Sequence, residues 1–435
     1  MTDLQKRNEL FSEYLETLNP EQRAAVDRVE GPVLVIAGPG TGKTQLLAVR
    51  IGNILLNTDT KAPNILCLSF TDAGVHAMRQ RLLGMIGPEA HRIPVHTFHG
   101  FCNRVIQDNM EYFGQGSLEP LTDLERIEIV RGLLSDLPVS HPLRSGRKDV
   151  YVYESQVRDL FANMKKEGWT PGFVLKKTDE FLRSLPTHPA YIYQVNSRYG
   201  KKGDPKLSQI TAVTEKMVRL KAAADLFPVY QKALDKAGRY EYEDMLLWVN
   251  KAFENHEALL RNYQERYQYI LVDEFQDTNG AQFRLLNQLL NYWDTPNVFI
   301  VGDDDQSIYE FQGARLENLE QFALDYQQGL GVVVLKENYR SSQEILDAAG
   351  RVIQNNKLRA VERLGITGGK QLIAHAGTGA TPVISRYESR THELAGLSVQ
   401  IRKLIEQGTE PSQIAVLYSR HKQADPVQSL FRKEG

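Results

Sequence analysis

The sequence predicts an α/β protein built around a mainly parallel sheet. Short apolar runs recur along the chain, and most of them are followed by a polar turn and then by helical periodicity. This alternation is typical of strand–helix units that pack around a parallel sheet. The expected strands are Val33–Ala37, Ile65–Phe70, Ile93–Phe98, Tyr269–Val272, Val298–Val301, Gly331–Leu335 and Ile414–Tyr418.

A long stretch of the chain interrupts this alternation. Between about Asn103 and Arg239 we find no convincing strand, and glycine and proline residues separate segments with helical patterning. We interpret this stretch as a mostly helical insertion into the first α/β domain. The α/β pattern resumes after the insertion and continues beyond Arg340. Within the insertion, the expected helices are Thr122–Leu134, Glu154–Glu167 and Ala212–Asp235.

The composition is that of a soluble, multidomain protein. The 435 residues correspond to about three domains, at roughly 150 residues each. The chain has 52 lysines and arginines against 54 acidic residues, so any nucleic-acid-binding surface has to be local. Two cysteines, Cys67 and Cys102, are too few for a disulfide framework and favour a reducing compartment. We find no secretory signal and no apolar run of ~18 residues that could span a membrane. We therefore expect a cytoplasmic protein with no membrane partner, associated with the nucleoid if it is bacterial.

Residues 33–56 combine a strand, a glycine-rich turn and a helix. Val33–Ala37 leads into Gly38-Pro-Gly-Thr-Gly-Lys-Thr44, and helical spacing follows. This order matches the Walker A phosphate loop, in which backbone N–H groups and a helix N-terminus surround phosphate oxygens. We expect Lys43 to reach the β- and γ-phosphates and the Thr44 hydroxyl to join the Mg²⁺ shell. The strict motif begins with glycine where this chain has Ala37, and a turn without a ligand is the alternative. The predicted nucleotide-binding residues of the loop are Gly38, Gly40, Thr41, Gly42, Lys43 and Thr44.

A second expected strand ends in two carboxylates. Tyr269-Ile-Leu-Val is followed by Asp273 and Glu274, which is the Walker B pattern. We expect Asp273 to hold Mg²⁺ and Glu274 to orient and deprotonate the attacking water, so that ATP is hydrolysed. Two acids at the start of a solvated loop are the alternative. The presence of Lys43 and Thr44 in the same chain favours the catalytic interpretation.

Further motifs follow one another along the chain. Six segments carry them: Leu18-Asn-Pro-Glu-Gln-Arg-Ala-Ala-Val26, Phe70-Thr-Asp-Ala, Val95-His-Thr-Phe-His-Gly-Phe101, Asp273-Glu-Phe-Gln-Asp-Thr-Asn279, Val301-Gly-Asp-Asp-Asp-Gln-Ser-Ile-Tyr309 and Lys336-Glu-Asn-Tyr-Arg-Ser-Ser342. Together with the phosphate loop they resemble the UvrD/Rep/PcrA branch of the superfamily 1 DNA helicases. A colinear series of this length is far more specific than any single motif.

The resemblance implies roles for individual residues at the nucleotide. Gln22 resembles the family glutamine that reads the adenine edge, and Tyr339 resembles the aromatic residue that stacks on the base. Gln306 resembles the residue that senses the γ-phosphate, and Arg340 resembles the arginine that reaches across an interdomain cleft. An arginine there would stabilise charge that develops on the transferred phosphoryl group. The expected catalytic set is Lys43, Glu274, Gln306 and Arg340.

The resemblance also implies a groove for single-stranded DNA. Phe70 and Phe311 match family aromatics that stack on bases, and Tyr309 lies beside the second of them. Thr71 and Asp72 follow the first aromatic, and Thr97 and His99 match a loop that contacts phosphates and sugars. These aromatics could instead belong to the core. Two departures predict weaker DNA affinity or altered stepping: the family usually has asparagine at Asp72, and it usually has Trp-Arg where this chain has Phe311-Gln312.

The insertion contains a locally basic stretch next to two tyrosines. From Gln194 to Ala222 the sequence has seven lysines and arginines but only two acidic residues, Asp204 and Glu215. Cations beside Tyr191 and Tyr193 would suit a nucleic-acid track. A solvated helical face with a flexible loop explains the stretch about as well, so both interpretations stay open.

The resemblance further divides the chain into four segments. Residues 1–104 and 239–343 form the two parts of a RecA-like ATPase domain, and residues 105–238 form the helical insertion. Residues 344–435 form an incomplete second RecA-like domain, because we find no later family motifs there. We therefore expect a fragment, a truncated form or a natural short form, in which translocation fails without the remainder of the second domain.

The sequence thus predicts an ATP- and Mg²⁺-dependent 3′–5′ DNA helicase that acts in DNA repair, replication or recombination. The expected partners are single-stranded DNA, single/double-strand junctions and repair or replication proteins. One alternative is the motor part of a helicase–nuclease. The other is a nucleotide-gated DNA-binding or scaffold module without productive turnover.

Overall fold

The computed structural model describes residues 11–114, 118–144, 149–307, 316–356, 363–365 and 369–434. The chain divides into two compact units, Met1–Gly377 and Thr378–Gly435. Among the described residues, no helix is long and apolar enough to cross a membrane.

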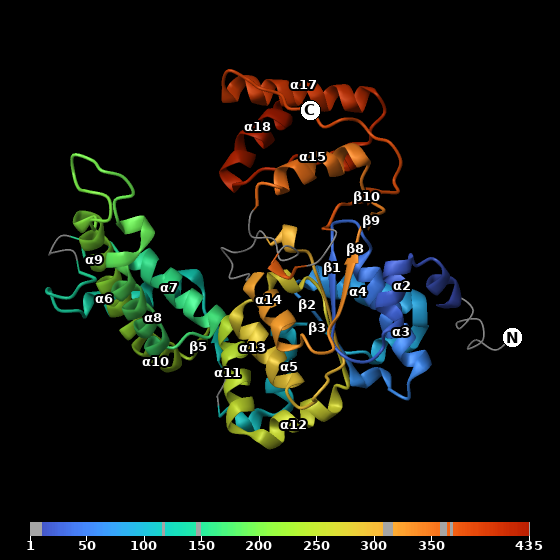
Figure 1. Cartoon of the computed structure of the whole chain (residues 1–435), viewed down its shortest axis with the longest axis horizontal. Coiled ribbons are helices and arrows are strands. Elements are labelled where there is room, and N and C mark those ends of the chain that lie inside the picture. The colour runs from blue at the N-terminus through green and yellow to red at the C-terminus, as the bar shows by residue number, and fades with distance from the viewer. Residues whose placement is uncertain are drawn as a thin grey trace. The chain divides into compact units, whose positions relative to one another are not determined.

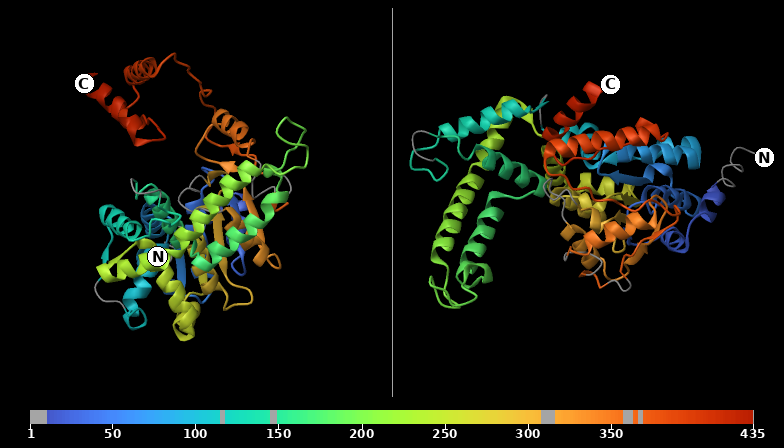
Figure 2. Two further views of the ribbon diagram at one scale, coloured as in Figure 1. Left: turned by 90° about the vertical axis from the view of Figure 1, so that its left-hand side faces the viewer. Right: turned by 90° about the horizontal axis from the view of Figure 1, so that it is seen from above.

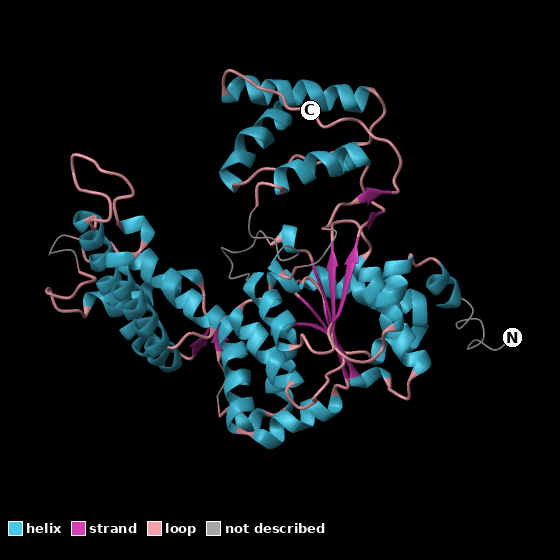
Figure 3. Cartoon of the chain, in the orientation of Figure 1, coloured by secondary structure: helices cyan, strands magenta, loops and turns pink. Residues whose placement is uncertain are grey.

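The first unit is built on a six-stranded sheet in which every pairing is parallel. The strand order is β3-β2-β6-β7-β1-β8. Figure 3 shows the strands side by side in one sheet. Their carboxyl ends therefore share one edge, which is where ligands bind in open α/β sheets. This confirms the predicted α/β fold with a RecA-like arrangement. The strands are β1 (Val33–Ala37), β2 (Ile65–Ser69), β3 (Val95–Thr97), β6 (Tyr269–Val272), β7 (Val298–Gly302) and β8 (Gly331–Leu335).

Helices cover both faces of this sheet, as Figure 1 shows. One face packs against α2 (Pro20–Asp27), α3 (Lys43–Asn57) and α4 (Asp72–Ile86). The opposite face packs against five other helices: α5 (Phe98–Asp108), α11 (Tyr242–Asn255), α12 (Glu257–Arg266), α13 (Gly280–Leu290) and α14 (Leu316–Asp325).

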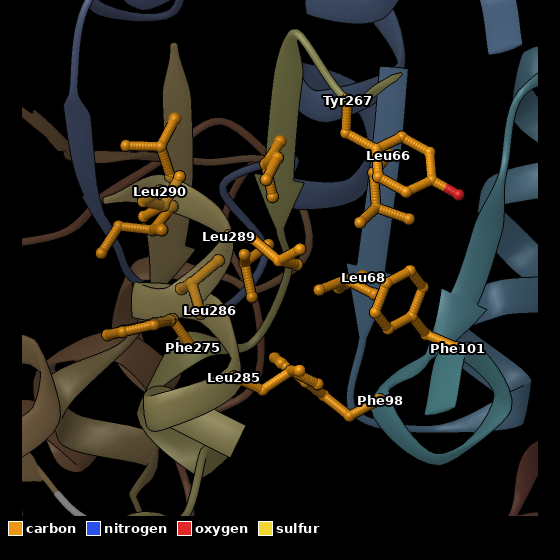
Figure 4. Close-up of a cluster of buried hydrophobic side chains, with 14 of the residues drawn as sticks. Leu66, Leu68, Phe98, Phe101, Tyr267, Phe275, Leu285, Leu286, Leu289 and Leu290 are labelled. Carbon is orange, nitrogen blue, oxygen red and sulfur yellow. The ribbon is translucent and has the colours of Figure 1, made fainter. Parts of the chain in front are cut away.

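Side chains of each strand alternate between the two cores. Leu66 and Leu68 enter the core with α5 and α13, which Figure 4 shows in close-up, whereas Ile65 and Cys67 enter the other core. Burial on both faces explains why these strands read as continuous apolar runs. The expected strand Ile93–Phe98 is shorter than predicted. Phe98 begins α5 instead, because the Thr97 hydroxyl caps that helix by accepting a hydrogen bond from the Gly100 N–H.

The predicted insertion is helical and has its own core. Its helices are α6 (Asp123–Ser135), α7 (Glu154–Glu167), α8 (Pro171–Ser184), α9 (Leu207–Asp225) and α10 (Phe227–Ala237), packed around Phe161 and Tyr230. Helices α8 and α9 run side by side and are joined by a long loop (Figure 2). Two expectations need correction. The stretch Ala212–Asp235 is two helices, because Pro228 starts a new helix after Leu226. A two-residue strand, β4 (Glu119–Pro120), also pairs with β5 (Arg239–Tyr240) where the insertion begins and ends.

After β8, the described part of residues 336–377 completes the first unit and contacts the phosphate loop through Asn338, Tyr339 and Leu372. Strand β9 (Glu337–Asn338) pairs in parallel with β10 (Ile373–Ala374), and α15 (Gln343–Ile353) lies between them in sequence. The second unit contains α17 (Arg390–Glu406) and α18 (Ala424–Glu434).

The prediction of a strand at Ile414–Tyr418 is wrong. In the described part of the chain no other strand pairs with this segment, and Leu417 is 93% exposed. An apolar run becomes a strand only where a neighbouring strand forms hydrogen bonds with its N–H and C=O groups. Among the described residues, no strand does so for this segment.

Candidate nucleotide-binding site

The phosphate loop connects β1 to α3 and has the backbone conformation that its glycines permit. Gly40 and Gly42 have φ angles of 68° and 83°, which side-chain-bearing residues rarely adopt. The buried Thr41 hydroxyl donates to the Gly38 carbonyl at 2.8 Å and holds the loop closed. Gly42 caps α3 without a side chain, so no side-chain oxygen competes for the N–H groups of the first turn. Such a helix start is suited to bind an anion.

Lys43 and the acidic end of β6 meet directly. The Lys43 ammonium lies 2.7 Å from Glu274 Oε2, and the Gln276 side-chain amide donates to the same oxygen at 2.8 Å. Glu274 has a φ of 49° and is the only non-glycine residue with a positive φ in the described ranges. Such backbone strain persists where the surroundings enforce it, most often at functional sites. The Walker A loop and the Walker B strand end, which the sequence analysis assigned to one site, are therefore in contact.

Asp273 and Asp277 are buried carboxylates beside Glu274. Burial and the neighbouring Glu274 charge raise the pKa of Asp273 to about 6, although Lys43 opposes the shift. The same two causes raise the pKa of Asp277 to about 6. The Oδ1 atom of Asp277 is buried without a hydrogen-bond partner. Carboxylates that are costly to ionise in this way fit a divalent cation with oxygen ligands, because the cation would compensate their charge.

We expect replacement of Asp277 by asparagine to stabilise the fold near pH 7.5 and to lose most of this advantage near pH 4. The pKa of Asp277 is higher in the folded chain than its ordinary value of 3.8, so the ionised carboxyl opposes folding above pH ~6. As the pH falls, the folded wild type takes up this proton before the unfolded chain does, and its unfolding free energy rises relative to the variant. The expected gain at the higher pH is about 1 kcal/mol after solvent screening.

Urea unfolding of both proteins at the two pH values measures this difference. Asp59→Asn, at an exposed position, is the control and should show no such pH dependence. An Asp277→Asn gain that is equally large at both pH values would contradict the assignment.

The residues predicted to bind the adenine base lie on one side of the phosphate loop. Gln22 is buried, and its amide donates to the Thr41 carbonyl at 2.9 Å while its oxygen accepts from the Asn19 backbone N–H. The Asn19 amide in turn donates to the Tyr339 hydroxyl at 3.1 Å. Tyr339 is 47% exposed, so part of its side chain is accessible to a ligand.

Arg340 also belongs to this side of the site. Its Cβ lies 2.7 Å from the position that a side chain at Gly40 would occupy, so the loop and the Tyr339–Arg340 segment are in contact. The Asn338 amide bonds to the Pro39 carbonyl at 2.5 Å, and the Tyr339 N–H bonds to the Gly40 carbonyl. The structure therefore brings Gln22, Tyr339 and Arg340 to the phosphate loop.

The residues predicted to bind DNA come together at the ends of two neighbouring strands. Strands β2 and β3 pair with Ser69 opposite Thr97, so the segments that follow them start side by side. Thr71 and Thr97 each cap the following helix through their hydroxyls, which is a structural role. Burial lowers the pKa of His99 despite the opposing charges of Glu243 and Asp72, and its Nε2 is buried without a partner. Phe70 is half-buried at the end of β2.

Two of the predicted DNA-binding residues, Tyr309 and Phe311, lie outside the described residues. Gln306, which precedes them, is described. Its amide donates to Asp303 Oδ2 at 2.7 Å, and the Asp303 N–H donates to Gln276 at 2.9 Å. Hydrogen bonds thus connect Gln306 through Asp303 and Gln276 to Glu274 and Lys43.

Sequence reasoning missed several side chains that complete the site. Gln276 belongs to the motif Asp273–Asn279, and its position two residues after Glu274 was the signal that could have identified it. Lys370, Leu372 and His375 had no such signal, because they follow the last motif. Lys370 contacts the aspartates after β7, Leu372 lies against Gly38, and His375 packs on the Tyr339 ring at 5.1 Å.

Comparison with known proteins places the whole chain in one family. The family model described as the UvrD/REP helicase N-terminal domain matches residues 18–327, and the model of the UvrD-like helicase C-terminal domain matches residues 333–435. The ATP-dependent DNA helicase PcrA of Bacillus subtilis is 28% identical over 431 residues, which are 98% of this chain and 51% of that protein. PcrA of Staphylococcus aureus strain COL is 30% identical over 421 residues, covering 96% of this chain and 50% of that relative.

A probable DNA helicase II homolog of Rickettsia conorii is 32% identical over 348 residues, which are 80% of this chain and 46% of that relative. The chain spans about half the length of the curated relatives that it matches. Because the N-terminal domain match alone covers well over half of the chain, and the motifs it contains meet in one site, this protein belongs to the UvrD/Rep family of superfamily 1 DNA helicases.

Proposed function

We propose that this chain binds ATP with Mg²⁺ and hydrolyses it in response to single-stranded DNA, as the N-terminal motor part of a 3′–5′ DNA helicase. The observation that carries the proposal is the Lys43–Glu274 contact at 2.7 Å, between the phosphate loop and a strained acidic strand end. Family membership supports the polarity and a role in DNA repair, replication or recombination. It also supports single/double-strand junctions and repair or replication proteins as partners.

In this proposal the phosphate loop binds the triphosphate through backbone N–H groups and Lys43. A bound γ-phosphate offers Lys43 a second set of oxygen acceptors beside Glu274. Both hydrogen bonds to Glu274 end on Oε2, so Oε1 is the oxygen that accepts a proton from the attacking water. Arg340, exposed at the loop, stabilises negative charge on the transferred phosphoryl group.

Asp273 and Thr44 are the residues that would hold Mg²⁺. Asp273 is buried at the end of β6, and Thr44 is the second residue of α3. When bound, the ion supplies charge neutralisation on the phosphate oxygens. The raised pKa of Asp273 supports this assignment, because a cation would favour the ionised carboxylate.

The base and the DNA use separate parts of the same sheet edge. Gln22 and Tyr339 bind the adenine beside β1, whereas Phe70, Thr97 and His99 line a track for single-stranded DNA beyond β2 and β3. Thr71 and Asp72 belong to the same track, as do Tyr309 and Phe311, which are proposed from the family resemblance. Because β6 lies next to β2, strand binding and hydrolysis act on adjacent elements of the sheet.

ATP hydrolysis by the chain, measured with and without single-stranded DNA, tests the proposal. We expect DNA-stimulated turnover, reduced at least about a hundredfold in Lys43→Ala, because the variant loses the cation beside the transferred phosphoryl group. Lys61→Ala, at an exposed position outside the site, is the matched control.

Two other outcomes would favour the alternatives. Tight binding of ATP and DNA without any turnover would favour a nucleotide-gated DNA-binding module. Turnover that appears only with a partner subunit that carries a nuclease would favour the motor part of a helicase–nuclease.

A further inference from the structure

Lys370 is a buried cation that no motif predicted. Its ammonium lies 2.5 Å from Asp303 Oδ1, 2.7 Å from Asp304 Oδ1 and 2.8 Å from Asp305 Oδ2. The lysine side chain is 2% exposed, and those of Asp303 and Asp304 are fully buried. One lysine, which lies 65–67 residues further along the chain, therefore contacts three consecutive carboxylates at the end of β7.

One of these carboxylates holds Gln306. Asp303 uses Oδ1 for Lys370, and its Oδ2 accepts a hydrogen bond from Gln306 Nε2 at 2.7 Å. An ionised carboxylate can only accept hydrogen bonds, so it selects the nitrogen end of the glutamine amide. The amide has a second N–H, which can donate to a further acceptor. The orientation of Gln306 thus depends on Asp303 being ionised and fixed.

Lys370 supplies both conditions. Burial raises the pKa of Asp303, and Lys370 and Lys43 oppose that shift, as does the Asp305 backbone N–H. Asp304 and Asp305 are the other charged groups at Lys370. Without the lysine, three adjacent carboxylates would repel one another, and Asp303 would tend to bind a proton. A protonated Asp303 could donate to the oxygen end of Gln306 and turn the amide around.

We propose that Lys370 is a positioning residue for nucleotide recognition, which fixes Asp303 so that the Gln306 amide presents an N–H to the terminal phosphate of ATP. The inference rests on the proposed ATP binding and on the role proposed for Gln306. Lys370 lies in the segment matched by the C-terminal domain model, whereas Gln306 lies in the segment matched by the N-terminal one. The contact therefore makes γ-phosphate recognition depend on a residue beyond the N-terminal family domain.

The experiment measures how well the chain distinguishes a triphosphate from a diphosphate, without requiring turnover. Dissociation constants for ADP and for a non-hydrolysable β,γ-imido analogue of ATP are measured with Mg²⁺ by displacement of a fluorescent nucleotide. The ratio of the two constants is the preference for the γ-phosphate. Gln306→Ala is expected to lower this preference about tenfold, which is typical for loss of a hydrogen bond to a charged group. Lys370→Gln is expected to lose most of the same preference while ADP affinity stays unchanged.

The double variant Lys370→Gln/Gln306→Ala should be no worse than Gln306→Ala, because both changes act through one amide. Lys370→Arg keeps the charge and should restore most of the preference. Arg363→Gln is the matched control, because it removes a cation from the same region of the chain. Arg363 pairs with Glu320 at 2.8 Å, and Glu320 lies outside the site. If Lys370→Gln does not fold, Asp303→Asn replaces it, since it removes the ionised acceptor and leaves Lys370 paired with Asp304 and Asp305.

Three results would overturn the proposal, and they differ from one another. A lowered melting temperature with an unchanged γ-phosphate preference in Lys370→Gln would show that the lysine only stabilises the fold. An unchanged preference in Gln306→Ala, with nucleotide still bound, would remove the role of Gln306 and leave ATP binding intact. Failure of the wild type to bind either nucleotide would refute the proposed function itself.

Discussion

Replacing Glu274 with glutamine is expected to reduce ATP hydrolysis by about 10²–10⁴-fold while nucleotide binding is retained. Glutamine has nearly the shape of glutamate and can still accept hydrogen bonds from Lys43 and Gln276, which now hold Glu274 Oε2. It cannot accept a proton from water at neutral pH, so the step that activates the nucleophile fails. The loss of its negative charge also frees Lys43 for the phosphates, so nucleotide affinity should stay the same or increase.

Steady-state hydrolysis and fluorescent-nucleotide binding on the same preparations measure the two effects separately. Glu265→Gln, at an exposed position on α12, is the control for the removal of one carboxylate. Hydrolysis in Glu274→Gln within tenfold of the wild type would exclude Glu274 as the base. Loss of hydrolysis together with loss of nucleotide affinity would instead indicate that Glu274 shapes the loop.

The second large effect concerns the junction between the helical insertion and the sheet domain. Lys165 on α7 is fully buried, and its ammonium lies 2.5 Å from Glu241 and 2.8 Å from Asp244 at the start of α11. Arg126 on α6 holds the other oxygen of Glu241 at 2.6 Å. Burial raises the pKa of Asp244 even though Lys165 opposes the shift. The insertion is therefore joined to the sheet domain through a buried ionic cluster.

We expect Lys165→Met to destabilise this junction by about 3–5 kcal/mol, because it leaves two buried carboxylates without their main cation. Urea unfolding followed by circular dichroism, with limited proteolysis of the insertion, measures the loss. Because the unpaired carboxylates prefer to be protonated, the deficit should shrink as the pH is lowered towards about 5.

Lys177→Met removes an exposed lysine that pairs with Glu180 in the same insertion, and it should cost less than about 1 kcal/mol. Equal losses for the two lysine variants would contradict the special position of Lys165. A full-sized Lys165→Met deficit that persists at low pH would point to lost packing rather than to uncompensated charge.

The sequence determined the elements whose signals are local. Six of the seven expected strands are present, because a strand buried on both faces has to be apolar throughout. The Walker A loop and the acidic end of β6 could be recognised from residue type and order alone, since phosphate and Mg²⁺ chemistry restricts both. Helix α7 begins and ends at the predicted residues, Glu154 and Glu167.

The tertiary structure decided everything that depends on a distant partner. The apolar run Ile414–Tyr418 has the composition of a strand, yet it forms none, because strand formation needs a neighbour to take its hydrogen bonds. Packing around the end of β6 produces the strained backbone of Glu274. It also brings Lys43 and Gln276 within hydrogen-bond distance of the Glu274 carboxylate. No feature of the sequence marked Lys370. Its role depends on its contacts with three carboxylates that lie 65–67 residues earlier in the chain. A buried charge is tolerated only beside its counter-charges, and only the folded chain shows which residues those are.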